Sequence, residues 1–516
     1  MIALILAVAA PVAPLHAQAS HAAARDTAAV SGLVADVTGG KVRGAALVGG
    51  GTVFLGIPYA RPPVGPLRWR EPARVEAWTG IRDAAAYGPP CAQNPYFNPV
   101  VKETAREDCL YLNIWTPEIS STRGGRAVMV WIPGGGNYAG ASGQRTSGEK
   151  LMRRNVVVVS LNYRLGLFGF FSHPDLTRES PHRASGNQGI LDQIAALRWV
   201  QANIATFGGD PANVTIFGES AGSLNVSVLM TSPLSRGLFR RAIGQSGAVI
   251  LAGEPLSLKD AESRGASLAE TWGAGVKPSL ATLRALPMAA ILKAEPNFLN
   301  KPQPNLGIMI DGYVFAVRPS VVFAQGRQHR VAMLLGNLAH EWVPGVKPPA
   351  NLEQAIEGSY PADAAKRALS LYMESGTHPL YGTPAEQWVG DTGFRCSAVA
   401  QLVWHATARN VAYEYQVEHL PVGRRQGNAH AQDIPYVFGK LDGEGYGAVD
   451  SAMSEVMQKY WTNFAKTGNP NGPGVPPWPS FDPTLRAYVA FTDEGAVAKK
   501  GLRRPFCDLF VENLRP

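Results

Sequence analysis

A serine in a glycine-flanked turn is the feature that most constrains the fold of this chain. Residues 214–217 are rich in β-branched and aromatic side chains and predict a short buried strand. The turn at 218–222 reads Gly-Glu-Ser-Ala-Gly, and residues 223–230 predict a helix. This arrangement strains the serine backbone and lifts its hydroxyl clear of a sheet. It predicts Ser220 as a nucleophile, with a structural turn and an N-cap serine as the alternative.

The rest of the chain predicts an α/β fold. Residues 127–132, 156–161 and 331–335 are continuous apolar runs, as expected of strands that are buried on both faces. Amphipathic patterns predict helices over 192–204 and 451–467. Strands that alternate with helices predict a large, mainly parallel, doubly wound sheet with helices on both faces. Because no linker interrupts the chain, we expect one domain over residues 20–516, with helical insertions.

Composition and the first residues limit the compartment and the partners. The net charge is +8, but there is no basic run and no zinc or phosphate-loop spacing, which argues against a nucleic-acid partner. Residues 1–19 resemble a secretion signal with an apolar core and an Ala-Gln-Ala end, although a basic start is missing. No later run is apolar enough to span a membrane. We expect a secreted or periplasmic protein, in which the four cysteines form disulfides in one of three pairings.

A serine nucleophile needs a base, which is usually a histidine that a carboxylate orients. The candidates after Ser220 are His329, His340, His378, His405, His419 and His430. His419 ends a predicted strand, whereas His430 lies in the long loop after it. A long loop can reach back to the nucleophile, so His430 is favoured over His419 as the base.

For the carboxylate, Glu341 is the best placed, because it follows the strand at 331–335 by a short loop. Asp311 is the second candidate, although Asp-Gly is also a common turn. Glu219 is adjacent to the serine, and we expect it to be a buried structural acid. The chain order of serine, acid and histidine is the one that this sheet topology uses. This chemistry needs no cofactor and no metal.

A glycine run at 134–136 follows the buried strand at 127–132. Glycines there allow backbone N–H groups to turn toward a developing oxyanion, and the N–H of Ala221 would add a third donor. Losing one such donor typically lowers the rate by about a hundredfold or more. A flexible loop is the alternative.

Taken together, these residues resemble the carboxylesterase and cholinesterase family of α/β-hydrolases, the type B carboxylesterases. The segment 207–222 is similar to the serine signature of that family, and 107–114, Glu-Asp-Cys-Leu-Tyr-Leu-Asn-Ile, is similar to its second signature. Further ordered similarities lie at 54–63, 162–166, 186–189, 245–247 and 433–439. The resemblance covers nearly the whole mature chain and implies a small-molecule ester substrate.

The resemblance also implies roles for single residues. Ser220 would be the nucleophile, Glu341 the acid and His430 the base. The oxyanion hole would be formed by the N–H groups of Gly135, Gly136 and Ala221. Ser246 would support the acid and the base. Cys91 would pair with Cys109, which leaves Cys396 and Cys507 as the second pair.

Two positions depart from the family pattern. Pro133 precedes the glycine run where the family often has histidine or tyrosine, and Asn137 follows it where an aromatic residue is usual. Asn137 therefore predicts a more polar substrate pocket, to which we also assign Tyr138. Arg145 and the net positive charge favour an ester with free carboxylates, with a solvated loop arginine as the alternative.

Other functions share these motifs. One is a non-catalytic, cholinesterase-like binding protein, which an intact set of Ser220, Glu341 and His430 argues against. The other keeps the same three residues but transfers the acyl group to another acceptor, or cleaves thioesters or amides. No feature of the sequence gives the oligomeric state.

Overall fold

The computed structural model describes residues 33–95, 101–119, 125–250, 255–295, 307–341, 343, 347–419, 421, 430–443 and 445–514. The signal predicted over residues 1–19 lies outside the described residues.

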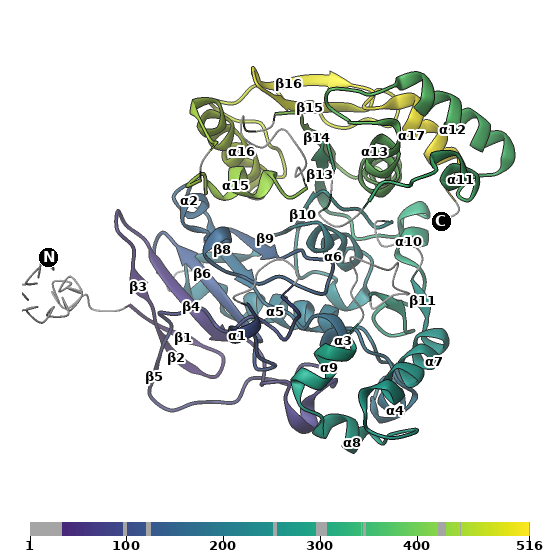
Figure 1. Ribbon diagram of the computed structural model, residues 1–516. Coiled ribbons are helices and arrows are strands. Elements are labelled where there is room, and N and C mark those ends of the chain that lie inside the picture. Colours follow the sequence, from purple (N-terminus) through teal and green to yellow (C-terminus); the bar gives the residue numbers. More distant parts are fainter. Residues whose placement is uncertain are drawn as a thin grey trace, which may run out of the picture.

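One large sheet organises the described chain and runs from β3 at the left of Figure 1 to β16 at the top. Its strands, in spatial order, are β16 (Gly495–Lys500), β15 (Ala487–Thr492), β14 (Ala412–Val417), β13 (Ala332–Leu338), β10 (Arg241–Gln245), β9 (Gly209–Glu219), β7 (Arg126–Ile132), β8 (Val157–Leu161), β6 (Tyr111–Thr116), β4 (Thr52–Pro58) and β3 (Ala45–Ala46). The pairs from β8 through to β15 are parallel, and the pairs toward both edges are antiparallel. The predicted α/β class with a mainly parallel sheet is therefore confirmed.

Two predicted strands were too short. β9 begins at Gly209 because this residue pairs with Arg126 of β7, so the strand extends well before residue 214. β13 continues to Leu338 because that residue pairs with Val417 of β14. Pairing with a neighbouring strand extended both elements beyond their apolar runs.

Helices cover both faces of the sheet because the side chains of each strand alternate between them. On one face, Val214 and Ile216 of β9 pack in a cluster with α5 (Gln188–Asn203), α6 (Ala221–Leu229) and α14 (Cys396–Thr407). On the other face, Phe217 packs with α2 (Glu149–Met152), α15 (Asp433–Phe438) and α16 (Ala448–Thr467). This buried middle layer gives a fixed base for the loops at the ends of the strands.

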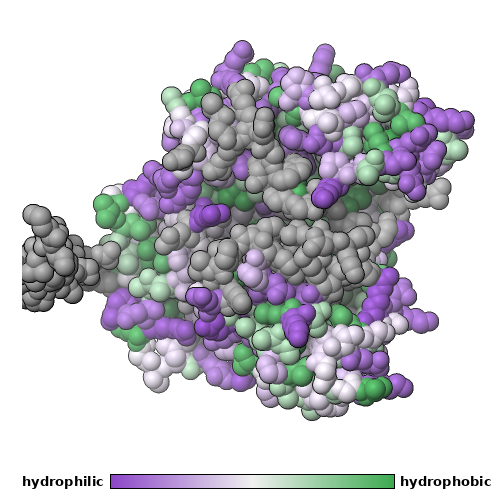
Figure 2. All heavy atoms as spheres, viewed as in Figure 1, coloured by the Kyte–Doolittle hydropathy of each residue, from purple (hydrophilic) through white to green (hydrophobic). Residues whose placement is uncertain are grey.

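The remaining elements lie around this layer in Figure 1. They are α1 (Val101–Thr104), α3 (Gly166–Gly169), α4 (Pro174–Glu179), α7 (Leu258–Ala269), α8 (Leu280–Ala285), α9 (Met288–Ala294), α10 (Pro319–Ala324), α11 (Leu352–Glu357), α12 (Ala362–Ser375), α13 (Pro384–Gly390), α17 (Arg504–Asn513), a small sheet of β1 (Val34–Val37), β2 (Gly40–Arg43) and β5 (Ile81–Asp83), and the pair β11 (Leu256–Ser257) and β12 (Met309–Ile310). Figure 2 shows hydrophilic side chains over much of the upper and lower parts of this face. No helix among the described residues is long and apolar enough to cross a membrane.

Candidate active site

Ser220 lies at a sharp turn between β9 and α6. Its backbone has φ 57° and ψ −124°, a combination that residues other than glycine rarely adopt. Its N–H donates a hydrogen bond to Gln245 O at 2.8 Å. Gly222 allows the tight approach, because a Cβ on this residue would lie 2.2 Å from Ile132 O. The strained serine is thus held between the ends of β7 and β10, and its role as a nucleophile stays a prediction.

Glu341 and His430 are in direct contact. The Glu341 side chain is buried, and its Oε2 lies 2.7 Å from His430 Nδ1. Its other oxygen accepts hydrogen bonds from Ser246 Oγ at 2.6 Å and from the N–H of Leu338 at 2.7 Å. Because both carboxylate oxygens are engaged, the carboxylate holds the imidazole in one orientation and keeps the proton on Nδ1. The structure therefore brings together the predicted acid Glu341, the predicted base His430 and Ser246.

The opposite nitrogen of His430 faces the turn that carries Ser220. Nε2 lies 3.2 Å from Glu219 Oε1 as an ion-pair contact, without the geometry of a hydrogen bond. Among the described residues, no hydrogen bond joins Ser220 Oγ to this ring. The ring also packs against Phe394, with the ring centroids 4.9 Å apart. In this state, Nε2 is directed at the residue before the serine.

Burial and neighbouring charges change the pKa values of His430 and Glu219. Burial lowers the pKa of His430, but the neighbouring carboxylates of Glu219 and Glu341 outweigh it, so that the pKa lies above its usual value. Burial raises the pKa of Glu219 to about 8, although the imidazole opposes this rise. Glu219 is buried, as predicted, and its carboxylate is the largest of the neighbouring charges that act on the imidazole of His430.

The glycine loop lies against the serine turn. A Cβ on Gly134 would meet Glu219 O at 2.3 Å and Ser220 Cβ at 3.1 Å, so only glycine fits at this position. Gly135 and Gly136 have φ values of 105° and 68°. Among the backbone hydrogen bonds of the described residues, none has the N–H of Gly135 or Gly136 as its donor. These donors are available beside Ser220, the predicted nucleophile.

The N–H of Ala221 adds to this set. Ala221 is the first residue of α6, and the first N–H groups of a helix have no acceptor within the helix. The positive end of α6 therefore lies at the serine, where an oxyanion would form.

The predicted pocket residues are placed differently from one another. Asn137 is 3% exposed, and its Oδ1 accepts hydrogen bonds from the Tyr163 hydroxyl at 2.9 Å and from Asn225 Nδ2 at 2.8 Å. Its amide is therefore used inside the fold and supports the glycine loop, so the predicted polar wall of the pocket does not come from this amide. Tyr138 is buried, and Arg145 is exposed.

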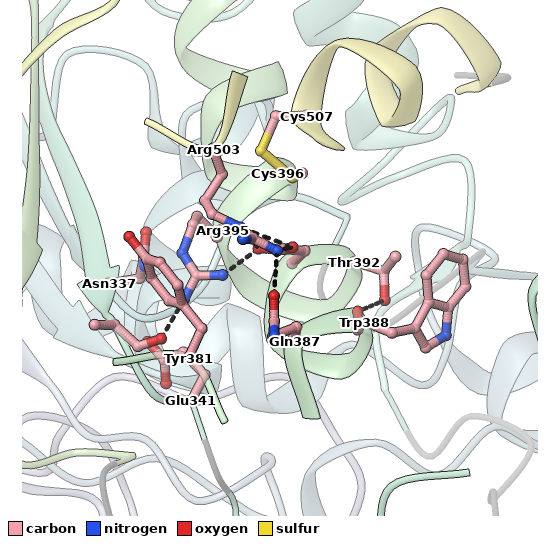
Figure 3. Close-up of polar contacts among 12 residues, drawn as sticks. Asn337, Glu341, Tyr381, Gln387, Trp388, Thr392, Arg395, Cys396, Arg503 and Cys507 are labelled. Carbon is pink, nitrogen blue, oxygen red and sulfur yellow. Dashed lines mark hydrogen bonds and ion pairs between the residues drawn. A yellow bond between two sulfur atoms is a disulfide. The ribbon is translucent and has the colours of Figure 1, made fainter. Parts of the chain in front are cut away.

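A buried arginine network lies next to the loop that carries Glu341 (Figure 3). The side chain of Arg395 donates to the carbonyl oxygens of Leu338 and Ala339, which precede Glu341, and to Gln416 Oε1 at 3.0 Å. Its charge is balanced by Asp391, which is fully buried. Arg395 thus anchors the loop that carries the catalytic carboxylate candidate.

A second arginine completes this network. Arg503 donates to Asp391 Oδ2 at 2.7 Å and to Gln387 Oε1 at 3.0 Å, and both arginines pack on the ring of Tyr381. Sequence reasoning missed the network, because its members come from separate segments and no local pattern pairs them. Arg395 ends a π-helical turn, Asp391–Arg395, and such irregular turns often occur at functional sites.

The alternative candidates are engaged elsewhere. Asp311 Oδ1 accepts the N–H groups of residues 313, 314 and 315, so this side chain closes a turn. His419 lies between two carboxylates, with Nδ1 2.5 Å from Asp493 Oδ1 and Nε2 2.9 Å from Asp450 Oδ1. His405 is buried and contacts the carbonyl oxygen of residue 331 through Nε2.

Both disulfides form as expected. Cys91 is bonded to Cys109, and Cys396 is bonded to Cys507. The second bond joins the start of α14 to α17, next to the arginine network in Figure 3. Among the described residues, no group of three or more histidines, cysteines and acids is arranged to hold a metal ion.

The sheet and the glycine-flanked serine turn define an α/β-hydrolase. The model of the carboxylesterase family matches residues 31–510, and the chain belongs to this family. It is therefore a carboxylic ester hydrolase. A medium-chain fatty acyl-CoA hydrolase precursor from Anas platyrhynchos is 35% identical over an alignment of 486 residues, which covers 87% of this chain and 86% of that protein.

Two further relatives are similar over most of their length. The fumonisin B1 esterase of Sphingopyxis macrogoltabida is 36% identical over an alignment of 451 residues, which covers 83% of this chain and 81% of that protein. Among solved structures, the carboxylesterase EST55 of Geobacillus stearothermophilus is similar with a TM-score of 0.78 and 29% identity, over 92% of this chain and 99% of that chain.

Proposed function

We propose that this carboxylesterase is exported and hydrolyses its ester through an acyl-enzyme on Ser220, with His430 as the base and Glu341 as the orienting acid. The contact of 2.7 Å between Glu341 and His430, beside the strained serine turn, is the observation that carries the proposal. It fixes the imidazole with Nδ1 toward the acid and leaves Nε2 for proton transfer.

The proposed reaction has two halves. Nε2 of His430 takes the proton of Ser220 Oγ as the oxygen attacks the ester carbonyl, and the N–H groups of Gly135, Gly136 and Ala221 stabilise the oxyanion. The bond to the alcohol breaks, and His430 returns the proton to the leaving alkoxide. Water then attacks the acyl-enzyme by the same steps and releases the acid. For the first step, His430 must exchange its contact with Glu219 for one with the serine.

A fluorophosphonate probe tests the nucleophile. We expect one covalent adduct on the peptide that contains Ser220, with hydrolysis of p-nitrophenyl acetate lost in proportion to labelling. Ser220→Ala should abolish both, whereas Ser263→Ala, at an exposed position of α7, should change neither. An unlabelled Ser220 in an enzyme that hydrolyses esters would overturn this assignment.

Thioester cleavage is the second candidate, because one relative is named a fatty acyl-CoA hydrolase. A panel of acetyl, hexanoyl and decanoyl groups, each as a p-nitrophenyl ester and as a CoA thioester, separates the two chemistries. Adding ethanol and measuring ethyl ester formation tests acyl transfer. Comparing neutral and carboxylate-bearing esters in wild type and Arg145→Ala tests whether Arg145 selects anionic substrates.

Export is supported by the signal-like residues 1–19 and by the two disulfides. Expression of the full chain in a bacterial host, followed by N-terminal sequencing of the periplasmic and secreted protein, should give a start at Ser20. Full-length protein in the cytosol alone would contradict this proposal.

A further inference from the structure

A cavity lies at the opposite end of the strands from Ser220. It has a volume of about 590 Å³ and is formed where β10, β13 and β14 begin and where α16 ends. Because these three strands are parallel, their first residues share one edge of the sheet, and the residues after their last positions share the other. β10 alone separates Arg241, which lines the cavity, from Ser246, which supports the acid. At about 3.3 Å per residue, these positions are roughly 16 Å apart.

The lining of this cavity carries arginines and no acidic residue. Arg236, Arg240 and Arg330 are exposed at its wall, and among the described residues none of the three forms an ion pair. Some exposed arginines elsewhere pair with a carboxylate, as Arg367 does with Glu512 at 3.3 Å, and others, such as Arg74, have no ion pair with a described residue; at this cavity three such arginines line one hollow. The positive charge at this cavity is therefore left without a compensating group from the described protein.

The floor of the cavity holds a fourth guanidinium. Arg241 is 8% exposed, and its partners are neutral: the side-chain oxygen of Asn213 and, at 3.0 Å, the carbonyl oxygen of Ala465. Among the described residues, no acidic partner balances the positive charge of this buried guanidinium, and a charge acts more strongly where the dielectric constant is low. Arg241 adds to the field of the three arginines at the wall.

Two titratable groups respond to this field. The pKa of Arg241 is lowered by burial and further by the charge of Arg240. The pKa of His329, which also lines the cavity, is lowered by burial and then by Arg236. The smaller, charge-dependent part of both shifts has the sign expected when positive charges lie close together, and a bound anion would offset it.

We propose that this cavity is a binding site for a compact polyanion that carries phosphate or clustered carboxylate groups. Guanidinium groups bind such anions through paired hydrogen bonds, and the volume lies in the range of small-molecule sites. The four arginines line one cavity, which favours a small ligand over a nucleic acid or a membrane surface. The site is separate from the proposed ester chemistry and does not depend on it.

Calorimetric titration of the full-length enzyme with pyrophosphate and with citrate tests the proposal. The buffer should contain about 0.15 M salt, because the Debye length is then about 8 Å and nonspecific attraction is screened. We expect saturable binding of one or both anions with one site per chain, and no measurable binding of acetate. Preference between pyrophosphate and citrate assigns the ligand to the phosphate or the carboxylate class.

Arg236→Ala with Arg330→Ala should weaken this binding by about a hundredfold, which is about tenfold for each charged contact. The matched control is Arg74→Ala with Arg264→Ala, which removes the same charge at exposed positions outside the cavity. Both double variants should keep the wild-type melting temperature and esterase kcat.

Equal binding by the two double variants would overturn the proposal, because the anions would then respond to net charge alone. Absence of saturable binding in the wild type would also overturn it. A third contrary result is cosedimentation with anionic vesicles in the absence of binding to either small anion, which would assign the patch to a membrane surface. As a folding control, Arg236→Lys with Arg330→Lys should retain most of the affinity.

Discussion

Replacing Gly134 with alanine tests whether the glycine loop and the serine turn act as one rigid unit. The added Cβ would lie 2.3 Å from Glu219 O, whereas ordinary contact begins at 3.4 Å. The loop or the turn must therefore move by about 1 Å, and a displacement of that size at a catalytic site costs about a hundredfold in rate. The overpacking itself should lower the free energy of unfolding by about 1–3 kcal/mol.

The matched control is Gly143→Ala, which adds the same methyl group later in the same connection. A Cβ on Gly143 meets nothing within 4 Å, so kcat should stay within about twofold of wild type. The assay is kcat and KM for p-nitrophenyl acetate, together with the rate of fluorophosphonate labelling, which also needs the oxyanion donors. If Gly134→Ala folds and has the kcat of Gly143→Ala, the close contact does not position the oxyanion donors, and our reasoning is refuted.

Three further predictions concern the surroundings of the site. Glu219→Gln should lower the pKa of His430, because Glu219 contributes most among the neighbouring charges that raise this pKa. The acid limb of kcat/KM, which rises as His430 loses its proton, should therefore move to lower pH. An unchanged acid limb would contradict this prediction. Arg395→Met should reduce kcat more than it changes KM and should lower the free energy of unfolding by about 3–5 kcal/mol. Arg395→Lys should have a kcat and a stability between those of Arg395→Met and wild type. Equal kcat in all three enzymes would show that the network does not position Glu341. Replacing Cys396 and Cys507 with serine opens a link across 111 residues and should lower the free energy of unfolding by about 2–4 kcal/mol in denaturant titrations, and a variant as stable as wild type would contradict this value.

Much of the site follows from local sequence. The Gly-x-Ser-x-Gly turn requires a tight strand-to-helix connection, and the glycine run requires a loop with positive φ values; both are properties of a few neighbouring residues. The apolar runs predicted the class of the sheet, because a strand covered on both faces is apolar at most of its positions. The acid and the base could be chosen because the ends of parallel strands meet at one edge.

Tertiary structure alone decided what surrounds these groups. Asn137 turns its amide inward to Asn225, which is 88 residues away, and Arg395 reaches the loop before Glu341 from a different helical segment. The contact between Glu219 and His430 likewise joins the end of β9 to the segment before α15, which is remote in the sequence.

The cationic cavity is the clearest case of this division. Its arginines come from separate segments that approach one another only because β10 lies next to β13 in the sheet. The local pattern of side chains reports which face of a strand is buried and where a turn must occur. The local pattern does not tell which remote segments meet at one edge of the sheet. That depends on the spatial order of the strands, and packing of the whole core determines this order.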